Sequence, residues 1–287
     1  MNIFKWIIAI VILFPVAAPA QDAFTIMQQV YDRDDGRTLI SRIRLVTFPY
    51  AYQGGRVVAT QQPRIKEMTY VTKDYGPGDK DHRSVSVLTA PKQEQGIGFL
   101  QFDYADSDKE TDQWMYLSSL GKVRRIVSGN DHEPKIGSYF GSEFNYEDLE
   151  SFKVSDYTYA LMGEEIHRDK ACWVVEMTPV PKKAMKSNYS RERVWVDKQR
   201  HLVLKSVRYS RSNREVKHIY FGDIRAIEGV LIAGKIVVDN VETRRRTLLS
   251  HENVTVNRPV EDDYLSLRTL TDKSYRQRKL KEYRQDK

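Results

Sequence analysis

The sequence has very little cysteine, glycine and proline for its length. Its single cysteine, Cys172, excludes an intrachain disulfide and a cysteine-rich zinc site. With 15 glycines and 10 prolines among 287 residues, long flexible linkers are not expected. Apolar residues make up 40% of the chain and charged residues 30%, a balance that excludes collagen, low-complexity disorder and a polytopic membrane protein. The length allows one large all-β domain or two smaller domains.

The sequence also lacks the common catalytic motifs. Its six histidines are scattered, and none lies four residues from another. The patterns H-E-x-x-H and G-x-S-x-G and the P-loop are absent. Cys172 lies in an apolar predicted strand, so we interpret it as a buried and inert thiol. We therefore predict that the protein is not an enzyme and has neither catalytic residues nor a cofactor.

Five carboxylates alternate along the segment between two predicted strands. They are Asp103, Asp106, Asp108, Glu110 and Asp112. Alternating carboxylates are typical Ca²⁺ ligands, but the glycine of an EF-hand is absent and Lys109 interrupts the run. We therefore interpret this segment as a solvated hairpin turn and predict no metal site.

Basic residues outnumber acidic residues by 46 to 39, which gives a net charge of +7. They are dispersed through the predicted strands, and 244–246 is the only run of three. Nucleic-acid binding is therefore not expected. The tail over 272–287 carries seven Lys or Arg residues and few apolar ones. We interpret it as a frayed or solvated helix, and the alternative is a basic patch for anionic lipid headgroups or an acidic partner surface.

Residues 1–20 have the features of a signal peptide. Lys5 supplies a positive charge, residues 6–18 form a nearly uncharged apolar run, and 18–20 read Ala-Pro-Ala, a small-x-small cleavage site. The apolar run of 13 residues is too short to span a bilayer. We expect cleavage after residue 20 and export to the periplasm. This leaves a single domain over 21–271, followed by the basic tail over 272–287.

The periodicity of apolar residues predicts a short helix followed by many strands. Apolar residues recur at helical spacing over about 22–33, and from about residue 43 onward they recur with a period of two. Residues 49–63 are predicted to form a loop or an extra hairpin. Further strands are predicted near 64–74, 83–90, 97–104, 112–117, 122–127, 156–166, 170–178, 192–198, 201–210, 215–223, 230–241 and 246–256.

These segments predict the fold class. About a dozen strands separated by polar turns, with two or three short helices, indicate one antiparallel sheet that is strongly curved or nearly closed. The helices are expected on one side of it. One of them is a predicted N-capped turn over 145–149. Gly141, just before this turn, is predicted to adopt a φ that other residues resist.

Aromatic residues are abundant, 31 in all with 17 tyrosines, and many lie in the segments 98–104, 113–117, 140–149 and 172–176. Alternate residues of a strand point to opposite faces, so both faces of the sheet carry apolar groups. One face would pack on helices while the other lines a concave apolar pocket, and a filled core is the alternative. The candidate residues that line or support a cavity are Phe99, Trp114, Tyr116, Phe140, Phe144 and Trp173.

A basic stretch follows the predicted strand that contains Trp114. It contains Lys122, Arg124 and Arg125. These charges either lie on a solvated edge strand, where they discourage aggregation, or belong to a cavity rim or docking surface. A docking surface of this kind would attract a lipid headgroup or the acidic face of a partner protein.

Three stretches resemble a known family. They are W-M-Y-L-x-x-L-x-x-V-R-R-I within 113–126, F-G-S-x-F-x-Y-E-D-L at 140–149 and C-W-V-V-E at 172–176. In this order and spacing they resemble the LolA-like outer-membrane lipoprotein-sorting proteins. They are most similar to the longer branch, which is often encoded beside transporters of the resistance-nodulation-division type. Weaker matches lie at 195–197 and 262–270, so the resemblance covers roughly 25–270.

The resemblance implies a half-open β-barrel of about 11–13 strands, with a few short helices that close one side. It also implies an apolar cavity that shields acyl chains during passage across the periplasm. The function expected from it is that of a carrier or chaperone for lipidated proteins or lipid-like cargo. We expect a monomer whose membrane partner is an inner-membrane transporter of the resistance-nodulation-division type. The alternative is a periplasmic regulator or adaptor that senses a lipid and signals to a membrane partner.

Overall fold

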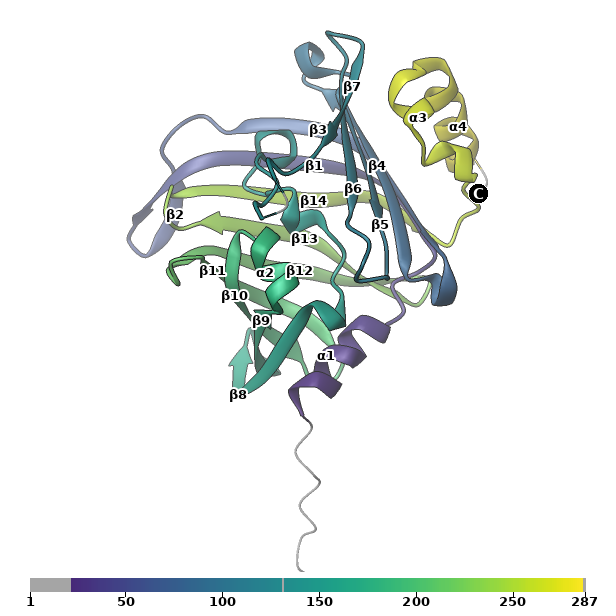
Figure 1. Ribbon diagram of the computed structural model, residues 1–287. Coiled ribbons are helices and arrows are strands. Elements are labelled where there is room, and N and C mark those ends of the chain that lie inside the picture. The colour runs from purple at the N-terminus through teal and green to yellow at the C-terminus, as the bar shows by residue number, and fades with distance from the viewer. Residues whose placement is uncertain (1–21, 131, 286–287) are drawn as a thin grey trace, which may run out of the picture.

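The computed structural model describes residues 22–130 and 132–285. The signal peptide predicted over 1–20 lies outside these residues. The described chain forms a curved antiparallel sheet with four α-helices and several short 3₁₀ turns (Figure 1). None of the helices in this part of the chain is long and apolar enough to cross a membrane.

The sheet contains fourteen strands, and its curvature leaves it open. Thirteen strands follow one path in the order β7-β6-β5-β4-β3-β1-β14-β13-β12-β11-β10-β9-β8, and β2 pairs only with β1. The prediction of one strongly curved antiparallel sheet is confirmed. The strands are β1 Thr38–Gln53, β2 Arg56–Ala59, β3 Arg64–Tyr75, β4 Asp81–Ala90, β5 Gly98–Asp103, β6 Asp112–Leu117, β7 Lys122–Ile126, β8 Tyr157–His167, β9 Lys170–Pro179, β10 Tyr189–Asp197, β11 Leu202–Ser210, β12 Glu215–Ile227, β13 Val230–Asn240 and β14 Arg245–Val256.

The pairing of the first strand with the last one organises the sheet into two arms. β1 pairs with β14 along ten residue positions, and β3 lies on the other side of β1. One arm therefore runs from β3 to β7 and the other from β13 to β8, with both edges unpaired in the strand order. The region over 49–63 is the end of β1 paired with β2, so it forms the extra hairpin rather than a loop.

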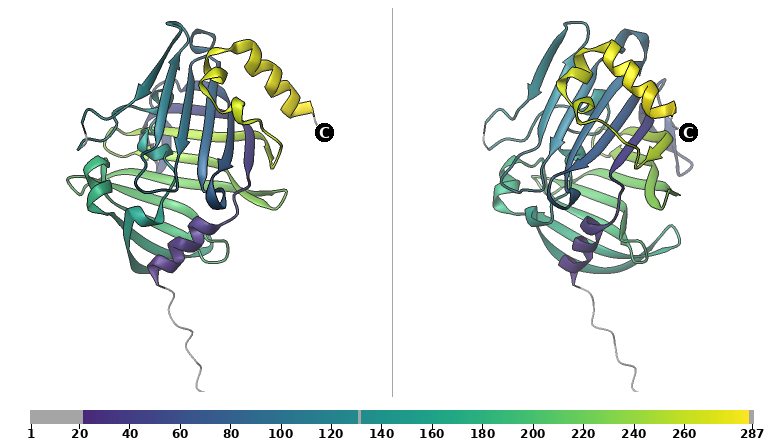
Figure 2. Two further views of the ribbon diagram at one scale, coloured as in Figure 1. Left: turned by 45° about the vertical axis from the view of Figure 1, so that its right-hand side comes forward. Right: turned by 90° about the vertical axis from the view of Figure 1, so that its right-hand side faces the viewer.

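The inner, concave face of the sheet is covered by two separate segments. The helix α1 (Ala23–Asp32) buries Ile26 and Met27 against apolar residues of β9 and β10. The segment 138–151 crosses the inner face of the other arm, and Figures 1 and 2 show it between the two arms. Its aromatic residues pack on Phe99, whose ring lies 5.3 Å from that of Tyr139 and 5.9 Å from that of Tyr146. This inner core also includes Met68 and Leu249.

The outer face of the first arm is covered by the C-terminal helices α3 (Leu267–Thr271) and α4 (Lys273–Gln285) (Figure 2). Leu270, Tyr275 and Leu280 are buried in one cluster with residues of β1, β3, β4 and β5. A Cβ atom at Gly98 would come within 2.6 Å of the Leu270 side chain, so glycine permits this close packing. The tail over 272–287 was expected to be a frayed or solvated helix. That expectation is wrong for α4, because its apolar side is packed on the sheet.

A short 3₁₀ turn over Glu147–Leu149 replaces the N-capped turn predicted at 145–149. The backbone N–H of Asn145 donates to the Asp148 carboxylate at 2.7 Å, which is the contact that the third residue of a capping box makes. Gly141 has a φ of +71°, which confirms the predicted unusual backbone. Phe140, just before it, also has a positive φ of 49°. The segment therefore turns sharply where it enters the inner core.

We predict that Gly141→Val lowers the free energy of unfolding by about 1–3 kcal/mol, because a β-branched residue is strained at this φ. No atom lies within 4 Å of a Cβ built at this position, so strain rather than a clash causes the loss. Gly141→Asn is the matched control, since asparagine tolerates a positive φ. Chemical denaturation of both variants tests this, and equal stability of Gly141→Val and the wild type would contradict it.

Candidate functional site

The two covers of the inner face leave a cavity of about 450 Å³ between them. This volume lies in the range of about 300–1,000 Å³ that is typical of small-molecule sites. One wall is apolar and comes mainly from the second arm of the sheet and the end of α1. It consists of Val30, Leu39, Leu202, Val203, Phe221, Leu231, Ile232 and Ile236.

A second cavity of about 170 Å³ adjoins the first along α1. Val30, Val203 and Phe221 line both cavities, so the two together form one elongated space with a mainly apolar surface. Charged side chains also line the smaller cavity, among them those of Glu147, Glu150, Lys183 and Arg208. Met27 and Met177 line the far end of the smaller cavity. Unbranched methionine side chains adapt to irregular shapes, so this end of the space suits a flexible apolar ligand.

The opposite wall of the larger cavity is polar and comes from β3, β4 and β5. Asp74 Oδ1 lies 2.6 Å from Nδ1 of His82, its neighbour across the strand pair. Burial raises the pKa of Asp74, because the charged carboxylate is desolvated. Burial opposes the charged form of His82, but the hydrogen bond and the negative charge of Asp74 outweigh it and raise the pKa of His82. The pair is therefore a polarised dyad that faces the cavity.

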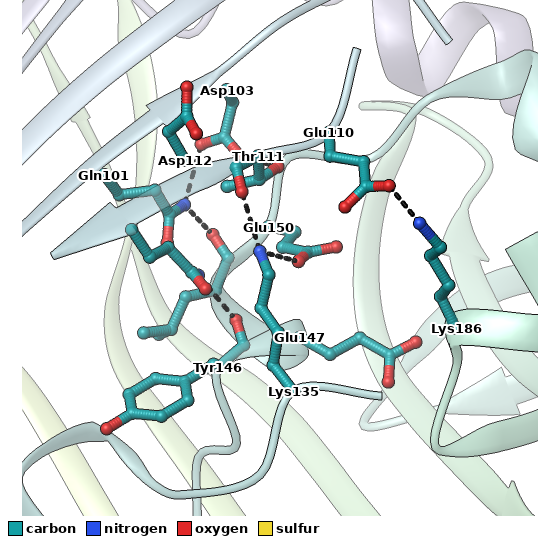
Figure 3. A network of polar contacts seen from close by, with 12 residues as sticks. Gln101, Asp103, Glu110, Thr111, Asp112, Lys135, Tyr146, Glu147, Glu150 and Lys186 are labelled. Atoms are coloured by element: carbon teal, nitrogen blue, oxygen red, sulfur yellow. Dashed lines mark hydrogen bonds and ion pairs between the residues drawn. The ribbon is translucent and has the colours of Figure 1, made fainter. Parts of the chain in front are cut away.

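A polar network below the cavity binds the backbone of the segment 138–151 (Figure 3). The Gln101 side chain donates to the carbonyl of Leu149 at 2.6 Å and to Asp103 at 2.7 Å. Gln113 donates to Gln101 at 2.7 Å and to the carbonyl of Tyr146 at 3.1 Å. These bonds satisfy backbone groups that would otherwise be buried without partners. The network thus fixes the segment against β5 and β6.

The acidic stretch 103–112 is only partly the solvated turn that the sequence suggested. Asp103 is 4% exposed and accepts hydrogen bonds from Thr111 and Gln101, and burial raises the pKa of its carboxyl group. Asp108 and Glu110 are exposed and pair with lysines. Within residues 22–130 and 132–285, no group of three or more His, Cys, Asp or Glu side chains is arranged to hold a metal ion.

A buried ionic cluster anchors the same segment to the second arm. The Asp148 side chain is fully buried and pairs with Lys217 and Arg208. The hydroxyl of Tyr189 donates to Asp148 at 2.7 Å. Burial opposes the charge of Asp148, but the two cations lower the pKa of its carboxyl group below the usual value. Next to it, Glu147 accepts the backbone N–H of Asn188 at 2.7 Å.

Ion pairs also connect the two arms across the mouth of the sheet. The short helix α2 (Pro181–Lys186) follows β9, and its lysines reach the hairpin between β5 and β6. Lys182 pairs with Asp108 at 2.6 Å, and Lys186 pairs with Glu110. Glu150 binds Lys183 at 3.0 Å and Lys135 at 3.2 Å (Figure 3 shows Lys135, Glu150, Glu110 and Lys186). These contacts tie the two arms together beside the smaller cavity, which Glu150 and Lys183 also line.

The structure divides the six predicted cavity residues into three groups. Phe99, Phe140 and Phe144 are buried in the inner core beside the cavity. Trp173 is half-buried in the cluster beneath α1. Trp114 and Tyr116 lie on the outer face, where they pack in the cluster of the C-terminal helices. None of the six is among the residues that line the two cavities, and a lipid-binding role for them stays a prediction.

The three predicted basic residues lie on the edge strand β7. All three side chains are exposed, and Arg125 pairs with Asp112 of β6. Arg124 opposes Met115 and Arg125 opposes Trp114, so their side chains point to opposite faces. Lys122, Arg124 and Arg125 therefore do not form a single patch on one face.

Several residues of the site were not anticipated from the sequence. His82 and Asp74 meet through the register of β3 and β4, which a single sequence does not reveal. Lys217 and Arg208 come from β12 and β11, far along the chain from Asp148. The acidic pair at 147–148 within the stretch 140–149 was the one available signal.

We predict that Asp148→Ala lowers the free energy of unfolding by about 3–5 kcal/mol, because it leaves two buried cations without a counter-charge. The amides of 139–149 should also exchange faster with solvent. Asp108→Ala removes an exposed ion pair and serves as the control, with no measurable loss expected. Denaturant titration and hydrogen exchange measure both effects. Equal behaviour of the two variants would show that the cluster does not anchor the segment.

Comparisons with known proteins identify the fold. A family model described as an uncharacterized protein matches residues 80–272. No curated protein matches the sequence. A DUF1329 family protein from Desulfovibrio piger superposes with a TM-score of 0.75 at 24% identity, covering 86% of this chain and 97% of that chain.

Two further structures are similar over most of their length. A putative outer membrane lipoprotein-sorting protein domain from Vibrio parahaemolyticus gives a TM-score of 0.74 at 24% identity, covering 87% of this chain and 98% of that chain. A LolA superfamily protein from Nitrosomonas europaea gives 0.61 at 17% identity, covering 86% and 98%. These likenesses establish the shared half-barrel fold, and the family model covers more than half of the chain. The chain therefore belongs to the family of this model, which is described as an uncharacterized protein, and it shares its fold with a LolA superfamily protein.

Proposed function

We propose that the protein is a periplasmic carrier that binds the acyl chains of lipidated proteins or of lipid-like cargo on their way to the outer membrane. The observation that carries this proposal is the elongated apolar space on the inner face of an open half-barrel. Each CH₂ group moved from water into such a space contributes about 0.8 kcal/mol. A chain of several carbons is therefore bound with useful affinity and is shielded from aggregation.

The construction of the space also supports release of the cargo. Two of its covers, α1 and the segment 138–151, are separate pieces of chain rather than strands of the sheet. Met27 and Met177 provide adaptable surfaces at one end. A carrier needs this adaptability, because a tightly complementary pocket would retain its cargo.

The compartment and the partners belong to the same proposal. The predicted signal peptide and the lipoprotein-sorting name of the Vibrio parahaemolyticus neighbour support the periplasm. We propose an inner-membrane transporter of the resistance-nodulation-division type as the donor, with the protein acting as a monomer. No catalytic role is assigned to the polar wall.

A lipid-sensing adaptor is the second candidate function. The observation that favours it is the edge strand β8, which exposes Met162 at 50% and Ile166 at 73%. Exposed apolar side chains on an open sheet edge suit a lasting partner contact. Crosslinking in cells distinguishes the two functions. A single dominant inner-membrane regulator would favour the adaptor, whereas a transporter together with many outer-membrane lipoproteins would favour the carrier.

We predict that protein purified from the periplasm carries lipid or lipopeptide that native mass spectrometry detects. Phe221→Asp should weaken binding of a neutral fluorescent fatty-alcohol probe by about tenfold or more, because it places a charge in the apolar wall. Phe24→Asp is the control, since this side chain is 55% exposed on α1. Consistently empty wild-type protein that also fails to bind the probe would overturn the carrier function.

We further predict that the basic residues of β7 assist docking. The double variant Arg124→Glu with Arg125→Glu should slow cargo transfer to vesicles containing phosphatidylglycerol several-fold at low salt and less at high salt. The control is the double variant Arg56→Glu with Arg64→Glu. It changes the net charge by the same amount as the β7 variant, but at exposed positions in or near β2. Wild-type transfer rates for the β7 variant at all salt concentrations would place the docking surface elsewhere.

A further inference from the structure

The larger cavity is divided into an apolar wall and an acidic wall. The apolar wall includes Phe221 and Ile236 of β12 and β13, whereas Asp74 and Asp103 belong to β3 and β5 on the opposite side. Both carboxylates are more than 90% buried, at 8% and 4% exposure. An arrangement of this kind matches a ligand that has an apolar chain at one end and a polar head at the other.

The charged groups that line the cavity are predominantly acidic. Asp35 lies at the exposed rim, and Asp74 and Asp103 lie inside. The basic groups that line the cavity are two, the guanidinium of Arg33 and the imidazole of His82, compared with three carboxylates. His251 adds no charge near neutral pH, because burial lowers its pKa to about 4. The sign of the charge inside is therefore opposite to the net charge of +7 on the whole chain.

One carboxylate oxygen in this wall is available to a ligand. The two oxygens of Asp103 accept hydrogen bonds from Gln101, Thr111 and the backbone of Ser151. Asp74 differs, because only its Oδ1 atom is engaged, by His82. Within residues 22–130 and 132–285, no hydrogen-bond donor is found for Asp74 Oδ2. An acceptor of a largely buried residue that lines a cavity and lacks a donor is a natural contact for a ligand that brings one.

We infer that this cavity selects an amphiphile whose head donates hydrogen bonds and carries no negative charge, with an amine preferred over an alcohol. The head lies at Asp74 and His82, and the chain runs along Phe221 and Ile236. An ammonium group supplies three donors and a charge that complements the acidic wall. A carboxylate or phosphate head meets two buried carboxylates in a medium of low dielectric constant, which repels it. This inference rests on the proposed carrier function and adds the class of head group to it.

The test compares three ligands with the same chain: decylamine, decanol and decanoate. Each displaces a neutral fluorescent probe at about neutral pH, where the amine is protonated and the acid is ionised. We expect affinities in the order amine, alcohol, acid, with the amine at least about tenfold tighter than the acid. If only the net positive charge of the protein mattered, decanoate would bind more tightly than decylamine.

Variants connect the preference to the acidic wall. Asp74→Asn should reduce the amine-to-acid ratio about tenfold while decanol affinity changes less than about threefold. Asp35→Asn at the exposed rim does not disturb the buried wall and should reduce the ratio by a smaller factor, so it provides a test even if Asp74→Asn fails to fold. Asp108→Asn lies outside this cavity and is the control, with an unchanged ratio.

The outcomes separate this inference from the function on which it rests. Binding of all three ligands with equal affinity, or with decanoate tightest, would overturn the head-group selectivity and leave the carrier function intact. An amine preference that survives in both Asp74→Asn and Asp35→Asn would also overturn it. Failure of folded protein to bind any of the three would contradict the carrier function itself and, with it, the inference.

Discussion

An open, strongly curved sheet has an apolar concave face that must be covered, and this constraint accounts for most of the structure. The edge strands β7 and β8 do not pair, so the sheet does not close on itself, and other parts of the chain provide the cover. The helix α1 covers one arm and the segment 138–151 covers the other. Because the two covers do not meet completely, an apolar space remains between them.

Polar contacts determine where the cover of the first arm lies. Aromatic packing around Phe99 would tolerate some sliding, since hydrophobic contact is not directional. The charge of Asp148 must lie beside Lys217 and Arg208, and the backbone of the segment must meet Gln101 and Gln113. Buried ion pairs of this kind contribute modestly to net stability, but breaking them is costly. The shape of the cavity therefore depends on polar residues that do not line its apolar wall.

The sequence was sufficient to predict the strands and the class of fold. Alternating apolar residues mark nearly every strand, and the helical spacing of Ala23, Ile26 and Met27 marks α1. The same pattern did not tell which face of the first arm turns inward. Trp114 and Tyr116 share a face, as predicted, but that face packs on the C-terminal helices. A period of two shows which residues of a strand share a face. When both faces of the sheet are apolar, it does not show which of the two faces is the inner one.

The polar part of the site could not be predicted in the same way. The contacts of His82 with Asp74 and of Asp148 with Lys217 depend on strand register and on long-range folding, neither of which leaves a local pattern. The C-terminal helix was misjudged for a related reason. Its composition is strongly basic, and the few apolar residues that pack on the core, Tyr275, Leu280 and Tyr283, are too sparse to raise its average hydropathy.

The most direct measurement of the central claim is a crystal structure of the protein with a bromine-labelled fatty alcohol. The anomalous signal of the bromine atom reports where the end of the chain lies. We expect a bromine site within about 4–4.5 Å of the side chains of Val203, Phe221 or Met177 in the elongated space on the inner face. A bromine site confined to the outer face or to the edge strand β8, with the inner space empty, would contradict it.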